Sequence, residues 1–193
     1  MSEPPSVDRA VALAHELHRT QTRKGTAIPY VTHLWAVASL VGEHGGSEVE
    51  LAAAWLHDAV EDQGGAPTLA RIRAECGDEV ARLVAACSDT DVTPKPPWRA
   101  RKQAYLDGLE GADRSTLLVS CADKLHNARA TLLDLRELGP EVFERFNGGR
   151  EGTLWYYEAV AEVFARRLPG PLARELGRVV DALGQVASGH RSA

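Results

Sequence analysis

The segment AWLHDAVED, residues 54–62, joins an apolar helix-forming stretch to a compact group of histidine and carboxylate side chains. On a helix, residues four apart share a face, so His57 would stack over Glu61 and Asp58 over Asp62. Two aspartates at that spacing repel each other mildly, and a nearby cation would reverse the sign of this effect. The segment therefore predicts a helix with one face suited to a cation.

The rest of the chain is also patterned for helices. Apolar residues recur at helical spacing over residues 7–20, Pro29 is placed to open a second helix, and Ser47 is placed to cap a third that runs to about Asp62. Further helices are predicted at residues 68–75, 78–88, 99–109, 114–138, 150–167 and 171–186, with a loop at 89–97 and a flexible tail at 187–193. We find no alternating strand pattern and no internal repeat. We predict one all-α domain over residues 1–193, a bundle of roughly eight to ten helices with its core at about 7–168.

Composition argues against several classes of protein. The chain has 193 residues, 44% of them apolar and 25% charged, as expected for one soluble domain. A net charge of −5 disfavours general nucleic-acid binding. The N-terminus lacks a signal-peptide core, and no apolar run approaches the roughly 20 residues that span a bilayer. Cys76, Cys87 and Cys121 lack metal-type pairing, which predicts reduced thiols in a cytoplasmic protein. We expect no nucleic-acid or membrane partner, and the oligomeric state stays open.

Four residues could hold one divalent metal ion: His33, His57, Asp58 and Asp123. Asp123 interrupts the apolar run of residues 117–125, where a carboxylate is costly unless it is paired or bound to a metal. An ion pair with Lys124 or Arg129 would also account for it. His33 stands among apolar residues, where a histidine is more often a hydrogen-bonded core residue. Two imidazoles and two carboxylates suit Mn²⁺, Fe²⁺ or Zn²⁺, and such a metal suits hydrolysis of a phosphate ester.

Four stretches carry a resemblance to a known family: RKGTAIPYVTH at residues 23–33, AWLHDAVED at 54–62, a weaker basic stretch at 95–103, and CADKLHNAR at 121–129. Over about residues 7–165 the chain resembles the HD-domain metal-dependent phosphohydrolases. It looks most similar to the guanosine tetraphosphate hydrolase domains of Rel/SpoT proteins and to stand-alone small alarmone hydrolases, including the metazoan SpoT-homologue type. Since the Rel/SpoT synthetase and regulatory regions have no counterpart in the sequence, the resemblance implies a stand-alone hydrolase with a single HD domain.

The resemblance implies a role for each motif residue. His33, His57, Asp58 and Asp123 would bind the metal, manganese in this family. Glu61 and Asp62 would handle protons, in a division that the sequence leaves open. Substrate contacts are expected from Arg23, Lys24, Asn127 and Arg150. Lys95, Arg99, Arg101 and Lys102 form a basic patch that would meet the 5′-phosphates or remain a solvated face. Trp155, Tyr156 and Tyr157 would stack on a base or belong to the core.

The reaction implied is removal of the 3′-pyrophosphate from (p)ppGpp, a small-molecule nucleotide, to give GDP or GTP and pyrophosphate. Two alternatives stay open: an HD phosphohydrolase acting on another nucleotide, such as (p)ppApp or NADPH, and a non-catalytic nucleotide sensor. The Glu61-Asp62 pair argues against a sensor, which has no need of proton-transfer groups. Gln63 to Gly65 and the region around Leu154 depart from the family pattern, which puts base selectivity in doubt.

Overall fold

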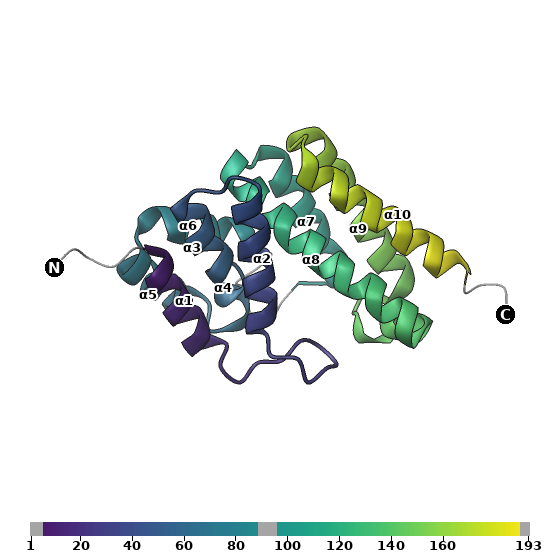
Figure 1. The fold of residues 1–193 in the computed structure, drawn as a ribbon, viewed down its shortest axis with the longest axis horizontal. Coiled ribbons are helices and arrows are strands. Elements are labelled where there is room, and N and C mark those ends of the chain that lie inside the picture. Colours follow the sequence, from purple (N-terminus) through teal and green to yellow (C-terminus); the bar gives the residue numbers. More distant parts are fainter. Residues whose placement is uncertain (1–5, 89–95, 190–193) are drawn as a thin grey trace. The chain divides into compact units, whose positions relative to one another are not determined.

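Helices form nearly all the regular structure in the computed structural model, which describes residues 6–88 and 96–189 (Figure 1). These residues contain ten α-helices and one 3₁₀ helix. Within them the extended pairing is limited to an isolated bridge between Thr22 and Pro29. The all-α prediction and the predicted number of helices are confirmed. Most of the predicted loop at 89–97, with Lys95, lies outside the described residues, as do the last four residues of the predicted tail.

The chain divides into two compact units, which are described separately. The first unit holds the described residues up to 88 and residues 113–122, and its elements are α1 (Ser6–Leu17), α2 (Val31–Glu43), α3 (Glu48–Leu56), α4 (Ala59–Asp62), α5 (Ala66–Cys76), α6 (Asp78–Cys87) and the start of α8 (Arg114–Leu138). The second unit holds residues 96–112 and 123 onward, and its elements are α7 (Trp98–Gly111), the remainder of α8, η1 (Pro140–Arg145), α9 (Gly149–Arg167) and α10 (Pro171–Gly189). A single domain over residues 1–193 remains a prediction.

Helix α3 is the centre of the first unit and contacts α1, α2 and α6. Its alanines Ala52, Ala53 and Ala54 are fully buried, and side chains this small let the neighbouring helices approach closely. The helix begins where the sequence predicted, because Ser47 forms a capping box with Glu50: the Ser47 hydroxyl accepts from Glu50 N–H, and the Glu50 carboxylate accepts from Ser47 N–H. The capping box stabilises the N-terminus of α3, and the C-terminus of the same helix leads into the pair His57 and Asp58.

The predicted helix from Glu48 to about Asp62 is wrong as a single element, because it is divided into α3 and α4 at His57 and Asp58. In an unbroken helix the carbonyl of Ala54 would accept from the Asp58 N–H. Here that carbonyl accepts a hydrogen bond from His57 Nδ1 at 2.7 Å, and Asp58 has φ −97° and ψ −4°. A side chain that competes for a backbone carbonyl in this way weakens the helical ladder. The first helix likewise ends earlier than predicted, at Leu17.

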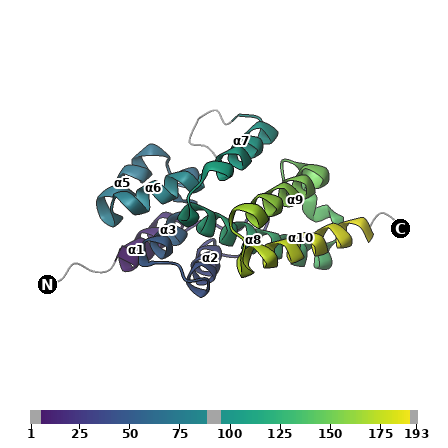
Figure 2. The same ribbon diagram turned by 90° about the horizontal axis from the view of Figure 1, so that it is seen from above.

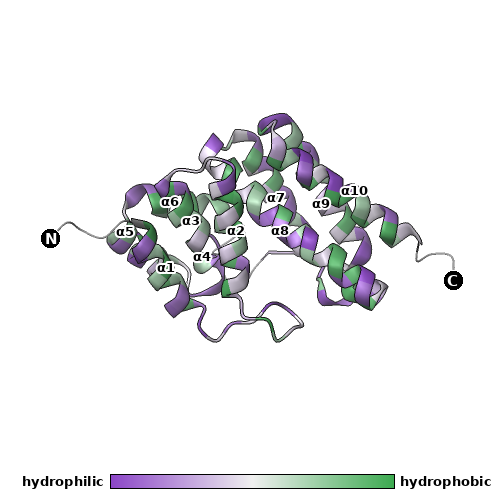
Figure 3. Ribbon diagram, viewed as in Figure 1, coloured by the Kyte–Doolittle hydropathy of each residue, from purple (hydrophilic) through white to green (hydrophobic). Residues whose placement is uncertain are grey.

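In the second unit, α9 packs against α10, α7 and η1. Helices α9 and α10 lie side by side in Figure 1 and Figure 2. Apolar and polar residues alternate along α10 in Figure 3, as expected of a helix that buries one face. The predicted end of this helix at residue 186 is wrong: α10 runs to Gly189, and Ala187 is 1% exposed. Its carbonyl accepts from Arg150 Nη2 at 2.5 Å, so the last turn is anchored to α9.

Two further expectations from the sequence concern the cysteine thiols and membrane-spanning helices. No disulfide joins Cys76, Cys87 and Cys121 within the described residues, and burial raises the pKa of the Cys76 and Cys121 thiols. None of the helices in residues 6–88 and 96–189 combines the length and the apolar character needed to cross a membrane.

Candidate metal centre

His57 lies at the end of α3, buried, with its two ring nitrogens in different surroundings. A carbonyl can only accept, so the bond to Ala54 requires a proton on Nδ1. In the neutral ring Nε2 is then the acceptor nitrogen, and it lies 3.0 Å from Asp58 Oδ2. The local fold therefore selects the tautomer that a metal ligand needs.

His33, on α2, is fully buried and lies across from this pair. Its Nε2 is 3.4 Å from the same Oδ2 atom of Asp58, and its ring meets that of His57 edge-on at 5.1 Å. Tyr30, immediately before α2, donates its hydroxyl to Asp58 Oδ2 at 2.6 Å. One carboxylate oxygen thus faces two imidazole nitrogens and a phenol.

Asp123 follows Ala122 in α8 and is buried. Its Oδ2 accepts from Lys124 Nζ and its Oδ1 from Asn127 Nδ2, both at 2.5 Å. Of the two ion pairs considered from sequence, the one with Lys124 occurs, whereas Arg129 pairs with Glu175. Burial lowers the pKa of Lys124, but Asp123, together with Tyr105 and Tyr156, outweighs this effect and leaves that pKa well above its ordinary value. Burial of Asp123 is therefore explained without a metal, and a metal argument must rest on the convergence of several ligands.

That convergence is present. One ligand atom from each of His33, His57, Asp58 and Asp123 lies within 4.8 Å of the others. Nitrogen and oxygen donors in this mixture fit Mn²⁺, Fe²⁺ or Zn²⁺. The four residues come from α2, the α3–α4 junction and α8, so the fold brings together all four of the predicted ligands. Below they are called the His-Asp cluster.

The two predicted proton-transfer residues lie on α4, directly after Asp58. Glu61 is half-buried and Asp62 is exposed. Asp62 Oδ2 accepts from the side-chain amide of Gln21 at 2.8 Å. Because α4 begins directly after Asp58, Glu61 and Asp62 lie about one helical turn from the His-Asp pair.

The loop between α1 and α2 carries Arg23 and Lys24. It is closed by backbone bonds from Arg23 N–H to the Ile28 carbonyl at 2.8 Å and from Tyr30 N–H to the Gln21 carbonyl at 2.9 Å. The Arg23 guanidinium lies 5.8 Å from the centre of the Tyr30 ring, whereas Lys24 is exposed. Through Tyr30, this loop places Arg23 next to a residue that touches the His-Asp cluster.

The other predicted substrate contacts belong to the second unit. Asn127 binds Asp123, and Arg150 binds the Ala187 carbonyl. Tyr156 and Tyr157 belong to the core, while Arg99 stacks on the half-buried Trp155 at 3.1 Å. Contacts of these residues with a nucleotide remain predictions.

Sequence reasoning missed three residues beside the cluster: His18, Gln21 and Tyr30. The ring of His18 stacks on that of Tyr30 at 5.3 Å, and its Nδ1 lies 2.6 Å from Gln21 Oε1. Burial lowers the pKa of His18, so its neutral form is favoured. The signal for Tyr30 was its place three residues before His33 in the basic loop motif. The polar Gln21 gave no local signal.

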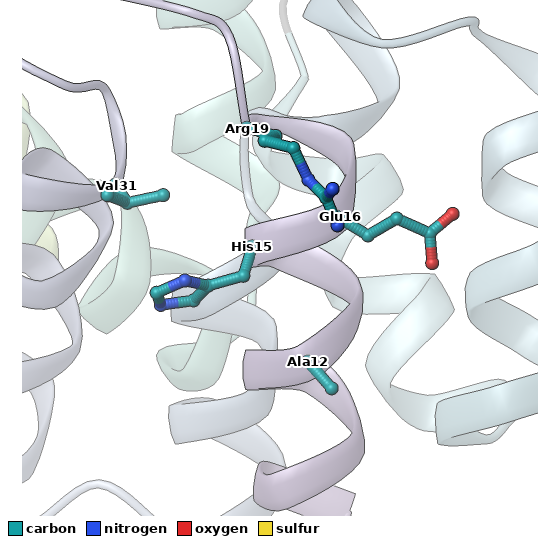
Figure 4. Close-up of a pocket in the computed structure, with 5 residues that line it drawn as sticks. All are labelled: Ala12, His15, Glu16, Arg19 and Val31. Carbon is teal, nitrogen blue, oxygen red and sulfur yellow. The ribbon is translucent and has the colours of Figure 1, made fainter.

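A separate hollow of about 500 Å³ lies over the exposed side of α1, lined by Ala12, His15, Glu16, Arg19 and Val31. Figure 4 shows His15 directed toward Val31 and Glu16 directed to the opposite side of α1. Glu16 binds Arg71 through two hydrogen bonds of 2.6 and 2.7 Å. The hollow and the His-Asp cluster have no lining residue in common.

The protein is therefore an all-α protein with a candidate metal cluster. The cluster combines a histidine, a consecutive His-Asp pair and an aspartate distant in sequence. The chain belongs to the HD domain family, whose model matches residues 10–154. The matched region includes the whole His-Asp cluster and the Glu61-Asp62 pair.

Curated relatives include proteins of the (p)ppGpp system. The chain is 36% identical over 136 residues, 70% of its length, to a probable GTP pyrophosphokinase of Mycobacterium leprae. It is 33% identical over 172 residues, 88% of its length, to a probable guanosine-3′,5′-bis(diphosphate) 3′-pyrophosphohydrolase of Synechocystis. These matches span only 16% and 20% of the two relatives, so their names describe much longer proteins.

A solved structure matches nearly the whole chain. It is that of a metazoan ortholog of SpoT described as hydrolysing ppGpp. The TM-score is 0.77, with 95% of this chain and 98% of that chain covered, at 24% identity. At this identity the match supports the fold: a protein of comparable length adopts the same helical arrangement.

Proposed function

We propose that the chain is a metal-dependent hydrolase that removes the 3′-pyrophosphate from (p)ppGpp, giving GDP or GTP and pyrophosphate. The observation that carries the proposal is the His-Asp cluster, with one ligand atom from each of four residues within 4.8 Å of the others and two carboxylates on the next helical turn. The Synechocystis relative and the metazoan SpoT ortholog, both named for ppGpp hydrolysis, support the choice of substrate. A cytoplasmic location and a single domain over residues 1–193 belong to the same proposal.

The donor set fits a divalent cation, Mn²⁺ in this proposal, held by His33, His57, Asp58 and Asp123. When bound, such a cation supplies Lewis acidity that makes a water molecule nucleophilic at neutral pH. His57 contributes Nε2 because its Nδ1 proton is committed to the Ala54 carbonyl. Lys124 donates to one oxygen of Asp123 and Asn127 to the other, and together they fix the carboxylate plane.

Glu61 and Asp62 orient the attacking water and pass a proton to the departing 3′-oxygen. Arg23 and Lys24 neutralise the charge of the 3′-pyrophosphate, so that water attacks its phosphorus against less repulsion while the bond from phosphorus to the 3′-oxygen breaks. In the second unit, Asn127 and Arg150 would bind the base or sugar, and to do so Arg150 would release or share its bond to Ala187. Because Arg150 would give up part of this hydrogen bond, its contact with the nucleotide would contribute less binding free energy than that of Asn127.

The test is incubation of purified protein with ppGpp and Mn²⁺, with and without a chelator, followed by chromatographic detection of GDP and pyrophosphate. Asp58→Ala should abolish turnover and keep the helical circular dichroism spectrum. The matched control is Asp181→Ala, an exposed aspartate on α10, which should retain full activity.

Parallel incubations with pppApp and NADPH separate the alternatives. Turnover of one of these with ppGpp left intact would assign the cluster to another nucleotide. Tight ppGpp binding without products, in Mn²⁺, would favour a sensor. Near-normal ppGpp hydrolysis by Asp58→Ala would show that the reaction occurs elsewhere.

A further inference from the structure

Gln21 links three side chains next to the His-Asp cluster. Its Oε1 faces His18 Nδ1 at 2.6 Å and accepts from Gln63 Nε2 at 2.5 Å. Its Nε2 donates to Asp62 Oδ2 at 2.8 Å. Gln21 lies in the loop after α1, whereas Gln63 and Asp62 lie at the end of α4, so the contacts join segments about 40 residues apart in sequence.

The direction of the Gln21 amide is fixed by what surrounds it. Its oxygen is the acceptor for Gln63, and the Nδ1–H of neutral His18 can donate to the same oxygen. His18 is 1% exposed and is held by its stack on Tyr30. With the oxygen committed to these two donors, the amide nitrogen lies on the side of Asp62 and donates one of its two N–H bonds to that carboxylate.

The backbone of Gln21 is fixed as well. Its N–H donates to the His18 carbonyl at 3.1 Å, and its carbonyl accepts from Tyr30 N–H at 2.9 Å. Tyr30 also donates its hydroxyl to Asp58. Gln21 is therefore anchored at both its main chain and its amide oxygen, and one N–H of its amide is directed at the Asp62 carboxylate.

We infer that Gln21 is a positioning residue that holds the carboxylate of Asp62 in its working orientation for proton handling. The inference rests on the proposed function, in which Asp62 is one of two proton-transfer residues. Asp62 is exposed, and an exposed carboxylate exchanges freely among rotamers unless a bond selects one. Supporting residues of this kind affect activity by about 10- to 100-fold although they do not touch the substrate.

A purely structural role for Gln21 would be to fasten the loop to α4. The near-isosteric Gln21→Glu separates the two roles. It keeps an oxygen to accept from His18 and Gln63, so the loop stays fastened, but it replaces the donor to Asp62 by a second negative charge. The matched control is Gln103→Glu, because Gln103 donates to Asp107 at 2.9 Å in an equivalent exposed pair on α7.

The readouts are kcat and KM for ppGpp in Mn²⁺, with thermal melting as a check on folding. For Gln21→Glu we expect kcat to fall about 10- to 100-fold with KM changed by less than roughly threefold, since the lost interaction acts on the chemical step. Gln103→Glu should match the wild type. Gln21→Ala, which removes every contact, should lose no further activity in an Asp62→Ala background, because a residue that acts through Asp62 has nothing left to position.

Several results would overturn the inference. One is a kcat of Gln21→Glu equal to that of the wild type. Another is a further loss of activity when Gln21→Ala is added to Asp62→Ala. If the wild type leaves ppGpp intact, the proposed function fails, and crystal structures of wild type and Gln21→Glu then decide the inference. An Asp62 carboxylate in the same rotamer in both would contradict a positioning role, whereas a rotated carboxylate in the variant would support it.

Discussion

Replacing Tyr30 with phenylalanine would remove a single oxygen atom from the surroundings of the His-Asp cluster. That oxygen donates to Asp58 Oδ2 at 2.6 Å, the atom that also faces His33 and His57. The ring would remain, so its stack on His18 would be kept. The substitution therefore separates the hydrogen bond from the packing.

The magnitude follows from the charge and exposure of the acceptor. Hydrogen bonds to charged groups contribute about 1.5–3 kcal/mol. The Asp58 side chain is 23% exposed, so water replaces the lost donor only in part, and the middle of that range is expected. Loss of a partner that orients a metal ligand lowers metal affinity by about 10- to 100-fold, and about 2 kcal/mol, at tenfold per 1.4 kcal/mol, corresponds to roughly 30-fold weaker Mn²⁺ binding.

The assay is calorimetric titration of metal-free protein with Mn²⁺, which reports on the cluster without reference to any substrate. The control is Tyr156→Phe, since the buried Tyr156 hydroxyl makes no hydrogen bond within the described residues. Removal of such a hydroxyl should leave Mn²⁺ affinity unchanged and stability equal or slightly higher.

Unchanged Mn²⁺ affinity in Tyr30→Phe would refute the reasoning that Tyr30 orients a metal ligand. An equal loss in Tyr156→Phe would show that the effect is general loosening of the protein. A loss confined to Tyr30→Phe, with an unaltered melting profile of the metal-free protein, is the expected result.

Three further predictions concern stability and reactivity. Gly148→Ala should destabilise the protein by about 1–3 kcal/mol in urea unfolding, because the added Cβ would lie 2.6 Å from the Trp98 ring, whereas Gly184→Ala, with nothing within 4 Å, should be neutral or stabilising. The pKa of Asp113 is lowered from 3.8 chiefly by a backbone N–H of the first turn of α8. A carboxyl whose pKa is lower in the folded than in the unfolded protein stabilises the fold at pH values above its unfolded pKa. The stability advantage of wild type over Asp113→Asn should therefore be constant near neutral pH and disappear as the pH falls below 3.8. Acid unfolding of both proteins measures this difference. Burial raises the pKa of Cys121, so iodoacetamide should label this thiol far more slowly in the native than in the urea-unfolded protein.

Local signals explain what could be predicted from the sequence. Helix α8 has the predicted bounds, Arg114–Leu138, because Gly139 and Pro140 stop a helix whatever surrounds it. The Ser47 cap was likewise visible as a short-range pattern. The four candidate metal ligands were found because histidines and aspartates in apolar helices are chemically unusual, and the structure brings them together.

Contacts over long distances explain what was missed. The helix break at His57 depends on a side chain turning back to the Ala54 carbonyl, which periodicity does not register. The extension of α10 depends on Arg150 reaching Ala187 from another helix. Gln21 meets Asp62 from a loop 41 residues away, and no rule of spacing relates the two.

The four tryptophans of the chain form two pairs, one in each compact unit. Trp35 and Trp55 have ring centres 6.3 Å apart in the first unit, and Trp98 and Trp155 have theirs 6.2 Å apart in the second. Replacing either pair with phenylalanine would leave an intrinsic fluorescence signal that originates from one unit alone. Denaturation curves recorded from the two variants would then show whether the halves of the chain melt at a common midpoint, as one cooperative block, or at two.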